Sequence, residues 1–332
     1  MSFTEAVIVF ISSLSLSAIS SAVMARRLDQ ATGWLRFPEG LVGLVTALGA
    51  DTPEISSALA GITGGNHDLG LGVIFGSNIF NLAALLGVSA IISGRVRVGR
   101  PGVLLNGPVA LWITGVIAAQ VVGLLPPIAS GILIGIVFLP YIALLAATAE
   151  WVARLPGPAP ATEWLCRALG GTREDSRKAE TPPEPSSMDL LALIPLIVMV
   201  VLASVGLVHS ALVLGRDFGI SNTVLGTLVL APLTGLPNLV AAIGLAKKGR
   251  GPAVVVETFN SNSLNVFVGV LLPSVMVGIG SPSGQSVMSL WWMAGMTVGA
   301  VAWCAIRRGL TWPGGAALIA GYIAFMFAIL IF

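Results

Sequence analysis

Long hydrophobic stretches separated by short polar connections run along the whole chain. Each stretch is at least about 20 residues long, which is the length that an α-helix needs to cross ~30 Å of hydrocarbon. Ten such stretches can be counted, at residues 3–25, 37–64, 68–92, 103–124, 128–149, 188–209, 219–246, 253–279, 287–306 and 312–331. The pattern therefore predicts an all-α polytopic membrane protein with ten transmembrane helices.

Composition agrees with this fold class. The chain has 332 residues, of which 55% are hydrophobic and 10% are charged, so a water-soluble globule would lack the polar surface that it needs. The net charge of +2 is explained by basic loops and gives no indication of a nucleic-acid partner. Cys166 and Cys304 are expected on the reducing side of the membrane, where disulfides are rare.

The basic residues predict how the helices are oriented. If the N-terminus is outside, every one of the 17 Lys and Arg residues except Arg216 falls on the inner side. Short cytoplasmic loops are enriched in Lys and Arg, so both termini are expected outside and the linker at residues 150–187 in the cytoplasm. This linker is rich in Pro, Arg and Glu and is expected to be a mostly irregular hinge. The preference for Arg over Lys and the short loops are typical of a prokaryotic protein, which would lie in the plasma membrane.

The linker separates two halves, residues 1–149 and 188–332, that match each other. Four positions of the first half recur in the second at a constant offset of 184, and they pair as Pro53 with Pro237, Ser77 with Ser261, Asn78 with Asn262, and Asn81 with Asn265. The second and seventh spans, which carry the prolines, are five spans apart and so cross the membrane in opposite directions. The halves are therefore expected to be two inverted-topology five-helix repeats, an arrangement in which secondary transporters place ion sites near the bilayer midplane.

The two prolines are expected to break their helices in the middle of the membrane. Pro53 and Pro237 have no N–H to donate and clash with the carbonyl group four residues earlier. Hard cations such as Ca²⁺ bind carbonyl, carboxylate and hydroxyl oxygens. Asp51 and Glu54 lie one helical turn apart beside the first break. A carboxylate at the bilayer centre costs about 2.5–3.5 kcal/mol or more, which a bound cation would offset, so we expect a cation site here.

Neutral oxygens are expected from the helices that follow. Four side chains share helix faces at positions i and i+4, namely Ser77 with Asn81 and Ser261 with Asn265. Ser and Asn also form hydrogen bonds between membrane helices, so packing is the alternative role for each. Asn78 and Asn262 face away from these serines and fit either role. For Asp51 the alternative is a local hydrogen bond at the broken helix, whereas a packing role for Glu54 would not need a charge.

Polar motifs fall within residues 44–88 and 228–272. They comprise Gly49 to Glu54 and Gly76 to Asn81 in the first half, then Thr234 to Asn238 and Asn260 to Asn265 in the second. These motifs resemble the two α-repeats of the sodium/calcium exchanger family, in the cation/calcium exchanger superfamily. The resemblance implies antiport by alternating access, in which a central Ca²⁺ site and flanking Na⁺ sites are exposed in turn as the first and sixth spans slide across a stationary core.

By position, the resemblance also implies which residues hold the ions. Glu54 and Asn238 would lie at the central site. The residues around them would be Ser77, Ser261, Asn81, Asn265, Thr234 and the carbonyl groups of Ala47 and Ala231. The transported cations and the lipid bilayer are the partners that this implies, with no cofactor and no obligate protein partner.

Both motifs depart from the family pattern Gly-Thr-Ser-x-Pro-Glu. Ala50 and Asp51 replace Thr and Ser in the first, and Leu233, Gly235 and Asn238 replace Gly, Ser and Glu in the second. The position of Asn265, often acidic in the family, is neutral. Asp51 and Glu54 together carry two negative charges, enough to neutralise one Ca²⁺ or two monovalent ions. Glu257, one turn before Ser261, either adds a third or lies in the inner water-filled entrance as an attraction site or protonatable relay.

We therefore expect a secondary active antiporter that exchanges Ca²⁺ for Na⁺. A proton-coupled Ca²⁺/cation exchanger is the closest alternative, and a channel-like or non-transporting relative is a third. An intramembrane serine hydrolase would need His near Ser at membrane depth, whereas His67 and His209 fall at outer ends. An aspartyl protease needs two buried aspartates on different helices, and only Asp51 qualifies, so an enzyme is not expected.

Overall fold

Helices make up almost all of the described chain. The computed structural model describes residues 1–34, 39–147, 151–152, 154, 158–176 and 191–332. Within these residues, nine helical segments are long and hydrophobic enough to cross a membrane. They are α1 (Phe3–Trp34); α4 (His67–Asn81) with the π-helix η1 (Leu82–Val88) and α5 (Ser89–Ile92); α6 (Arg100–Val121); α7 (Pro127–Ala146); α11 (Leu193–Asp217); α12 (Asn222–Val224) with the π-helix η2 (Leu225–Leu230) and α13 (Ala231–Lys247); α14 (Gly251–Val266) with the π-helix η3 (Phe267–Leu271) and α15 (Leu272–Val277); α16 (Gly284–Arg307); and α17 (Trp312–Ile331).

The remaining predicted span, residues 37–64, is present as two short helices. They are α2 (Glu39–Ala50) and α3 (Thr52–Thr63), each of 12 residues. The prediction of an all-α protein with ten transmembrane segments is therefore confirmed. The predicted ends agree within a few residues except in the first and sixth segments, where α1 continues to Trp34 and α11 to Asp217.

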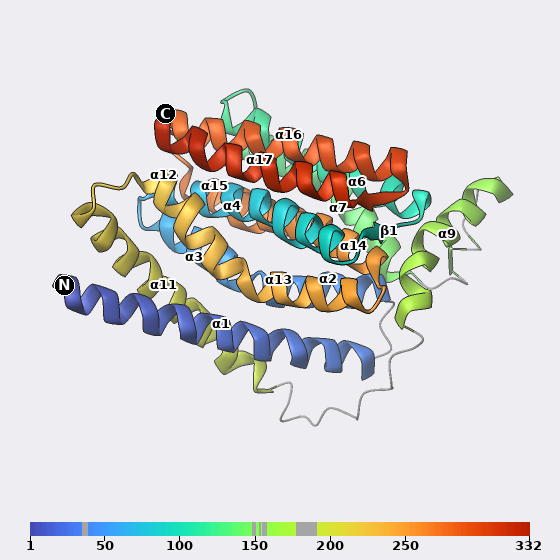
Figure 1. Cartoon of the computed structure of the whole chain (residues 1–332), viewed down its shortest axis with the longest axis horizontal. Coiled ribbons are helices and arrows are strands. Elements are labelled where there is room, and N and C mark those ends of the chain that lie inside the picture. The colour runs from blue at the N-terminus through green and yellow to red at the C-terminus, as the bar shows by residue number, and fades with distance from the viewer. Residues whose placement is uncertain (35–38, 148–150, 153, 155–157, 177–190) are drawn as a thin grey trace.

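The helices are arranged in layers (Figure 1). At one edge, α1 and α11 pack on each other, and they also contact α2, α3 and α13. Beyond α2, α3 and α13 lie α4 and α14, which contact α16 and α6 on the other side, while α17 packs on η1. In its most hydrophobic window, the segment His67–Ile92 has 94% of its residues buried, against 28% for α1. The core therefore lies around α4 and α14, and α1 and α11 lie outside it.

The two halves repeat the same local structure. In each half the polar helix runs directly into a π-helix, α4 into η1 and α14 into η3. The π-helices begin one and two residues after the matched positions Asn81 and Asn265. Because matching segments are five spans apart, the halves cross the membrane in opposite directions, as expected for inverted-topology five-helix repeats.

The backbones of α4 and η2 touch at glycine residues. A Cβ atom at Gly76 would lie 2.6 Å from the Cα of Thr227, and one at Gly226 would lie 2.5 Å from the carbonyl oxygen of Leu69. Small residues permit such close approach between membrane helices. This contact joins the central helix of the first half to the segment that leads into α13 in the second.

Replacing Gly76 by Ala is expected to lower the thermal unfolding temperature of the purified protein. The added methyl group would overpack the contact with Thr227, and overpacking costs about 1–3 kcal/mol. Gly115→Ala is the matched control, because Gly115 also lies within a transmembrane helix and a Cβ there meets no atom within 4 Å. Equal unfolding temperatures for the two variants would contradict the close packing of α4 on η2.

The prediction that both prolines break their helices is right only for the first half. There the chain turns at Asp51, and Pro53 lies in the first turn of α3, where its missing N–H costs no helical hydrogen bond. In the second half, α13 runs through Pro237 without a break. A proline can be held within a continuous membrane helix that bends, and the distortion of this half lies instead in η2, where the turns are wider.

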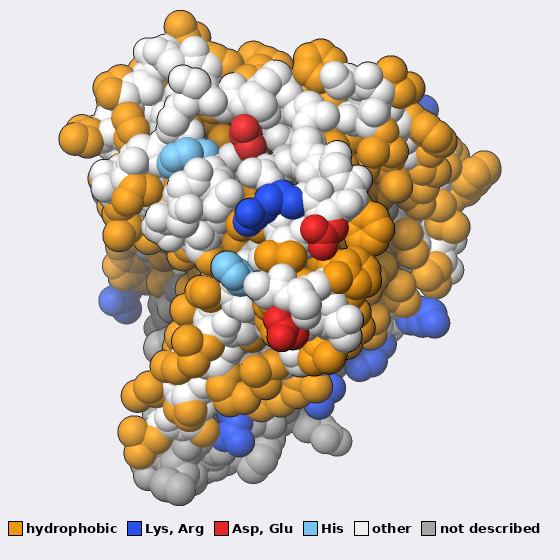
Figure 2. All heavy atoms as spheres, turned by 90° about the vertical axis from the view of Figure 1, so that its left-hand side faces the viewer, with side chains coloured by type: hydrophobic (Ala, Val, Ile, Leu, Met, Phe, Trp, Pro, Cys, Tyr) orange, Lys and Arg blue, Asp and Glu red, His pale blue; other side chains and the backbone are white. Residues whose placement is uncertain are grey.

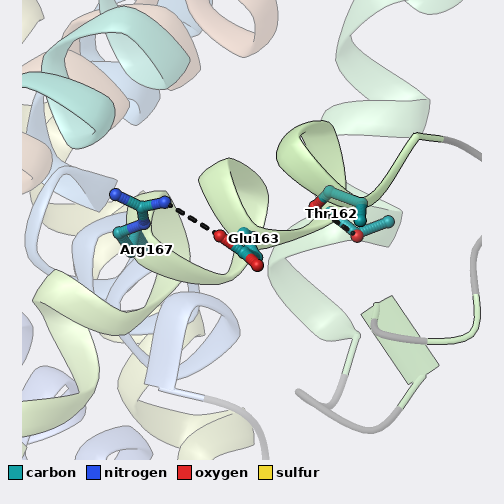
Figure 3. Close-up of polar contacts among 4 residues, drawn as sticks. Thr162, Glu163 and Arg167 are labelled. Carbon is teal, nitrogen blue, oxygen red and sulfur yellow. Dashed lines mark hydrogen bonds and ion pairs between the residues drawn. The ribbon is translucent and has the colours of Figure 1, made fainter.

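The prediction of a mostly irregular linker is also wrong where the structure describes it. Residues Ala159–Ser176 form helix α9, which packs on α6 and in which Ala168 and Leu169 are buried. Its exposed face carries an ion pair between Glu163 and Arg167 at 3.2 Å (Figure 3). An exposed pair at positions i and i+4 contributes only a few tenths of a kcal/mol, about 0.3–0.5. Packing against the bundle therefore accounts for this helix, and such packing cannot be inferred from the linker sequence alone. Residues 177–190 of the linker lie outside the described chain.

A short pair of strands, absent from the sequence-based expectation, joins two connections at the α9 end of the bundle. Strand β1 (Arg95–Arg97) pairs antiparallel with β2 (Gly309–Thr311), with Val96 opposite Leu310. Gly309 has φ 125°, and a Cβ there would lie 2.1 Å from the Val96 carbonyl oxygen. The strands tie the connection between α5 and α6 to the one between α16 and α17.

Candidate functional site

The candidate site lies where α2 ends and α3 begins. Since each of these helices has 12 residues, the junction is in the middle of the span. Asp51 occupies the junction and Glu54 lies in the first turn of α3. Both side chains are buried, with exposed fractions of 1% and 0%. The two carboxylates that the sequence singles out therefore lie at the centre of the bundle, away from lipid and bulk water.

Asp51 connects the two repeats. Its Oδ1 accepts a hydrogen bond of 2.8 Å from the Nδ2 of Asn238 on α13, and the hydroxyl group of Ser261 on α14 also lies against this carboxylate. Among the described residues, its Oδ2 has no hydrogen-bond partner. The local bond that was the alternative role for Asp51 is not what the structure shows, because its side chain does not cap α3.

Glu54 has no partner for either carboxylate oxygen in the described structure. Its Oε1 faces α13 at Gly235, where an added Cβ would lie 3.7 Å from that oxygen. Buried polar groups are nearly always paired, and an unpaired buried charge is costly. Three carboxylate oxygens, two from Glu54 and one from Asp51, thus lack the compensation that a cation would supply.

Three of the expected neutral ligands also carry an oxygen with no hydrogen-bond partner among the described residues. They are Ser77 Oγ, Asn81 Oδ1 and Asn265 Oδ1. Both amide nitrogens are already engaged: Asn81 Nδ2 donates to Ser261 Oγ and Asn262 Oδ1, each at 3.1 Å, and Asn265 Nδ2 donates to Asn78 Oδ1 at 3.3 Å. Because the amide orientations follow from these bonds, the carbonyl oxygens of both side chains are left to face a ligand as acceptors.

Asn78 and Asn262 hold the two halves together. The Nδ2 of Asn78 donates to the carbonyl oxygen of Asn262 at 3.0 Å, and the Nδ2 of Asn262 donates to the carbonyl oxygen of Asn78 at 3.1 Å. The pairing is reciprocal, as a two-fold relation between the repeats requires. Of the two roles open to these residues, packing between the repeats is the one that the structure shows.

Thr234, Ala47 and Ala231 lie near the site but are already hydrogen-bonded. Thr234 donates its hydroxyl hydrogen to a carbonyl of its own helix, with Leu230 O at 2.9 Å and Ala231 O at 3.2 Å. The Ala47 carbonyl accepts the N–H of Asp51 at 2.8 Å. Each of these oxygens keeps a lone pair, so their proposed role as ligands stays a prediction.

Glu257 is half-buried on α14. It lies two turns after the helix begins and one turn before Ser261, within electrostatic reach of both Asp51 and Arg250. Glu257 therefore lies between the buried carboxylates and the N-terminal end of α14. Both of its candidate roles, an ion ligand and a charged group in the entrance, are compatible with that position.

The structure adds three serines that the sequence analysis did not assign to the site. Ser21 of α1 lies with its Oγ 3.2 Å from Gly49 O and 3.0 Å from Ala50 O. Ser204 of α11 lies with its Oγ 3.5 Å from Pro53 O. Ser57, one turn after Glu54, is buried with an unpartnered hydroxyl. Two features of the sequence could have indicated these serines. Ser57 shares a helix face with Glu54, and Ser204 matches Ser20, the neighbour of Ser21, at the repeat offset of 184.

The donor set is one of hard oxygen ligands. Among the described residues, no three His, Cys, Asp or Glu side chains are grouped to hold a metal ion. The site instead combines two carboxylates with amide and hydroxyl oxygens. Oxygen ligands of this kind suit Ca²⁺ and other hard cations, whereas Zn²⁺ and soft metals prefer nitrogen and sulfur.

Comparison with known proteins points the same way. Residues 5–149 and 188–331 match the family model described as sodium/calcium exchanger protein. Inner membrane protein YrbG of Escherichia coli is 29% identical over 248 residues, which make up 72% of this chain and 70% of that protein. Sodium/potassium/calcium exchanger 2 of Gallus gallus is 32% identical over 65 residues, 20% of this chain and 10% of that protein.

Two solved structures share the fold. A crystal structure of the H⁺/Ca²⁺ exchanger CAX superposes with a TM-score of 0.70 at 14% identity, covering 98% of this chain and 87% of that one. The sodium-calcium exchanger NCX_Mj gives a TM-score of 0.63 at 20% identity, covering 98% and 99%. At these identities the likeness is one of fold, and it includes both repeats.

Proposed function

Because the chain belongs to the sodium/calcium exchanger protein family, we propose that it is a secondary active antiporter that exchanges Ca²⁺ for Na⁺ by alternating access. The observation that carries this proposal is the cluster of buried oxygens without partners at Asp51, Glu54, Ser77, Asn81 and Asn265. Two carboxylates balance the charge of one Ca²⁺ or of two Na⁺, so the same pocket can bind the two cargoes in turn.

The layered fold supports the transport mechanism. α1 and α11 lie outside the core around α4 and α14, and their hydroxyl groups contact backbone carbonyls of the broken helix through Ser21 and Ser204. Single hydroxyl–carbonyl contacts between membrane helices are weak, on the order of 1 kcal/mol or less. The pair can therefore slide across the core while the other helices of residues 1–149 and 188–332 keep the site assembled; the linker at 150–187 joins the two halves.

We place the protein in a bacterial plasma membrane with both termini outside. Both chain ends lie at the same end of the bundle, opposite α9 and β1 (Figure 1). Figure 2 shows that end, where histidine and acidic side chains lie among polar and hydrophobic ones and Lys and Arg are sparse. The basic connections lie at the α9 end, which the preference of cytoplasmic loops for Lys and Arg assigns to the cytoplasm.

Proton coupling is the rival for the second ion. Within the described structure, neither Asp51 nor Glu54 forms an ion pair, and a buried carboxylate can be neutralised by a proton as well as by a metal ion. Under this alternative, protons would move in the direction opposite to Ca²⁺ and would replace Na⁺ as the counter-ion.

Uptake of radioactive Ca²⁺ into proteoliposomes separates the two mechanisms. Under an outward Na⁺ gradient at equal pH on both sides, the Na⁺-coupled exchanger is expected to accumulate Ca²⁺, and uptake should stop when Na⁺ is replaced by choline. Uptake that needs a pH gradient and ignores Na⁺ would replace the Na⁺-coupled proposal by the proton-coupled one. Uptake without any counter-ion on the opposite side would indicate a channel and would overturn both.

A further inference from the structure

A polar pocket lies at the α9 end of the bundle, away from the buried carboxylates. Its volume is about 520 Å³. Its lining includes Ser93 just before β1, Arg95 and Arg97 in β1, Lys247 at the end of α13, and Gly249 and Gly251 where α14 begins. The pocket therefore lies between a connection of the first repeat and a connection of the second.

The charge of the pocket has one sign. Arg95, Arg97 and Lys247 are exposed, and none of the described residues that line the pocket is acidic. Arg95 donates from its guanidinium group to the carbonyl oxygen of Arg307 at 2.6 Å, which fixes it in place without neutralising it. Among the described residues, these three cations have no carboxylate partner. Their charge is thus available to a ligand.

The backbone of the pocket is held rigidly beside the start of α14. A Cβ at Gly251 would lie 2.7 Å from the carbonyl oxygen and 2.9 Å from the nitrogen of Arg97. Only glycine allows β1 to approach the helix this closely, so Arg97 is fixed next to the first turn of a 16-residue helix. The helix dipole there adds to the attraction that the side chains exert on an anion.

We propose that this pocket binds a phosphate group. Two arginines and a lysine supply charge and the forked donors that suit phosphate oxygens, and the first turn of α14 lies beside them. The site lies where transmembrane helices end, at the level of lipid headgroups. Both an anionic phospholipid headgroup and free phosphate present this chemistry, and neither ligand is transported through the buried oxygen cluster.

The test uses the full chain in nanodiscs of phosphatidylcholine. In one arm inorganic phosphate is added and binding is followed by the rise in thermal unfolding temperature; in the other, phosphatidylglycerol replaces part of the lipid and retained lipid is counted by native mass spectrometry. Neutralising Arg95, Arg97 or Lys247 to Gln is expected to weaken binding by roughly fivefold each, the effect of about one basic residue on anionic headgroups.

Lys248→Gln and Arg100→Gln are the matched controls, because both residues are exposed neighbours in sequence that do not line the pocket. Binding that falls in the pocket variants and persists in the controls supports the proposal, and the arm that responds identifies lipid or free phosphate as the source. Absence of binding in both arms, or equal loss in pocket and control variants, overturns it. Ca²⁺ uptake is measured separately, so failure here leaves the antiport proposal standing.

Discussion

Replacing Glu54 by Gln is expected to reduce Ca²⁺ exchange by roughly a hundredfold or more. The substitution keeps the shape of the side chain and removes the charge from a residue whose two carboxylate oxygens have no hydrogen-bond partner in the described part of the chain. Breaking a buried interaction between charges costs about 2–5 kcal/mol, and each ~1.4 kcal/mol is a factor of ten. The measurement is Ca²⁺ uptake into proteoliposomes, together with the rise in unfolding temperature that Ca²⁺ causes, which should be lost in the variant.

The same variant distinguishes a ligand from a structural residue. In ion-free buffer the Glu54→Gln protein is expected to unfold at the same or a higher temperature than the parent, because an uncompensated buried charge is destabilising. Glu163→Gln on the exposed face of α9 serves as control and should leave both uptake and unfolding unchanged. Undiminished uptake by the Glu54 variant would move the ion site elsewhere in the protein.

Exchanging the side chains of residues 51 and 238 is expected to restore the activity that is lost when Asp51→Asn alone removes a charge. Asp51→Asn alone should reduce Ca²⁺ uptake by roughly tenfold or more, since it removes one of the two site charges. In the double variant Asp51→Asn with Asn238→Asp, the carboxylate moves to α13, the amide moves to the α2–α3 junction, and the hydrogen bond of 2.8 Å can form again in the reverse direction.

The four proteins of this cycle are compared for uptake and for the Ca²⁺ concentration at half-maximal rate. Recovery in the double variant beyond the sum of the single effects shows that residues 51 and 238 act as one acid–amide pair. If the double variant is as inactive as Asp51→Asn, the position of the charge matters more than its presence, and the pair interpretation is wrong. Asn238→Asp alone adds a charge and is expected to change ion preference more than rate.

Much of this arrangement could be predicted because the repeat is written in the sequence. The offset of 184 identifies Ser77, Asn81, Ser261 and Asn265, and all four side chains are buried. Asn81 donates to Ser261, whose hydroxyl group lies against Asp51. Charge in the middle of a hydrophobic span identifies Glu54. The repeat offset and the charge within a hydrophobic span could both be recognised because each depends only on the spacing and polarity of residues in one sequence.

Other features depend on contacts between segments and could not be predicted in this way. A proline has the same local chemistry at 53 and at 237, yet only the first half breaks, and in the second half the distortion lies in η2 before α13. Helix α9 forms within a Pro-rich linker because it packs on α6. The Asn78 and Asn262 side chains each donate to the backbone carbonyl of the opposite residue, and spacing along one helix does not predict such a contact between helices.

The reciprocal amide bonds between Asn78 and Asn262 bear on how the two halves can diverge. A change at either asparagine removes a donor that the opposite half needs, so neither gene segment can drift freely at that point. At residues 51 and 238, recovery in the double variant would mean that only the total charge of the pair is required, so that an acid could move from one half to the other. The reciprocal hydrogen bonds between Asn78 and Asn262 would thus hold the two repeats together while nearby substitutions change the ion preference.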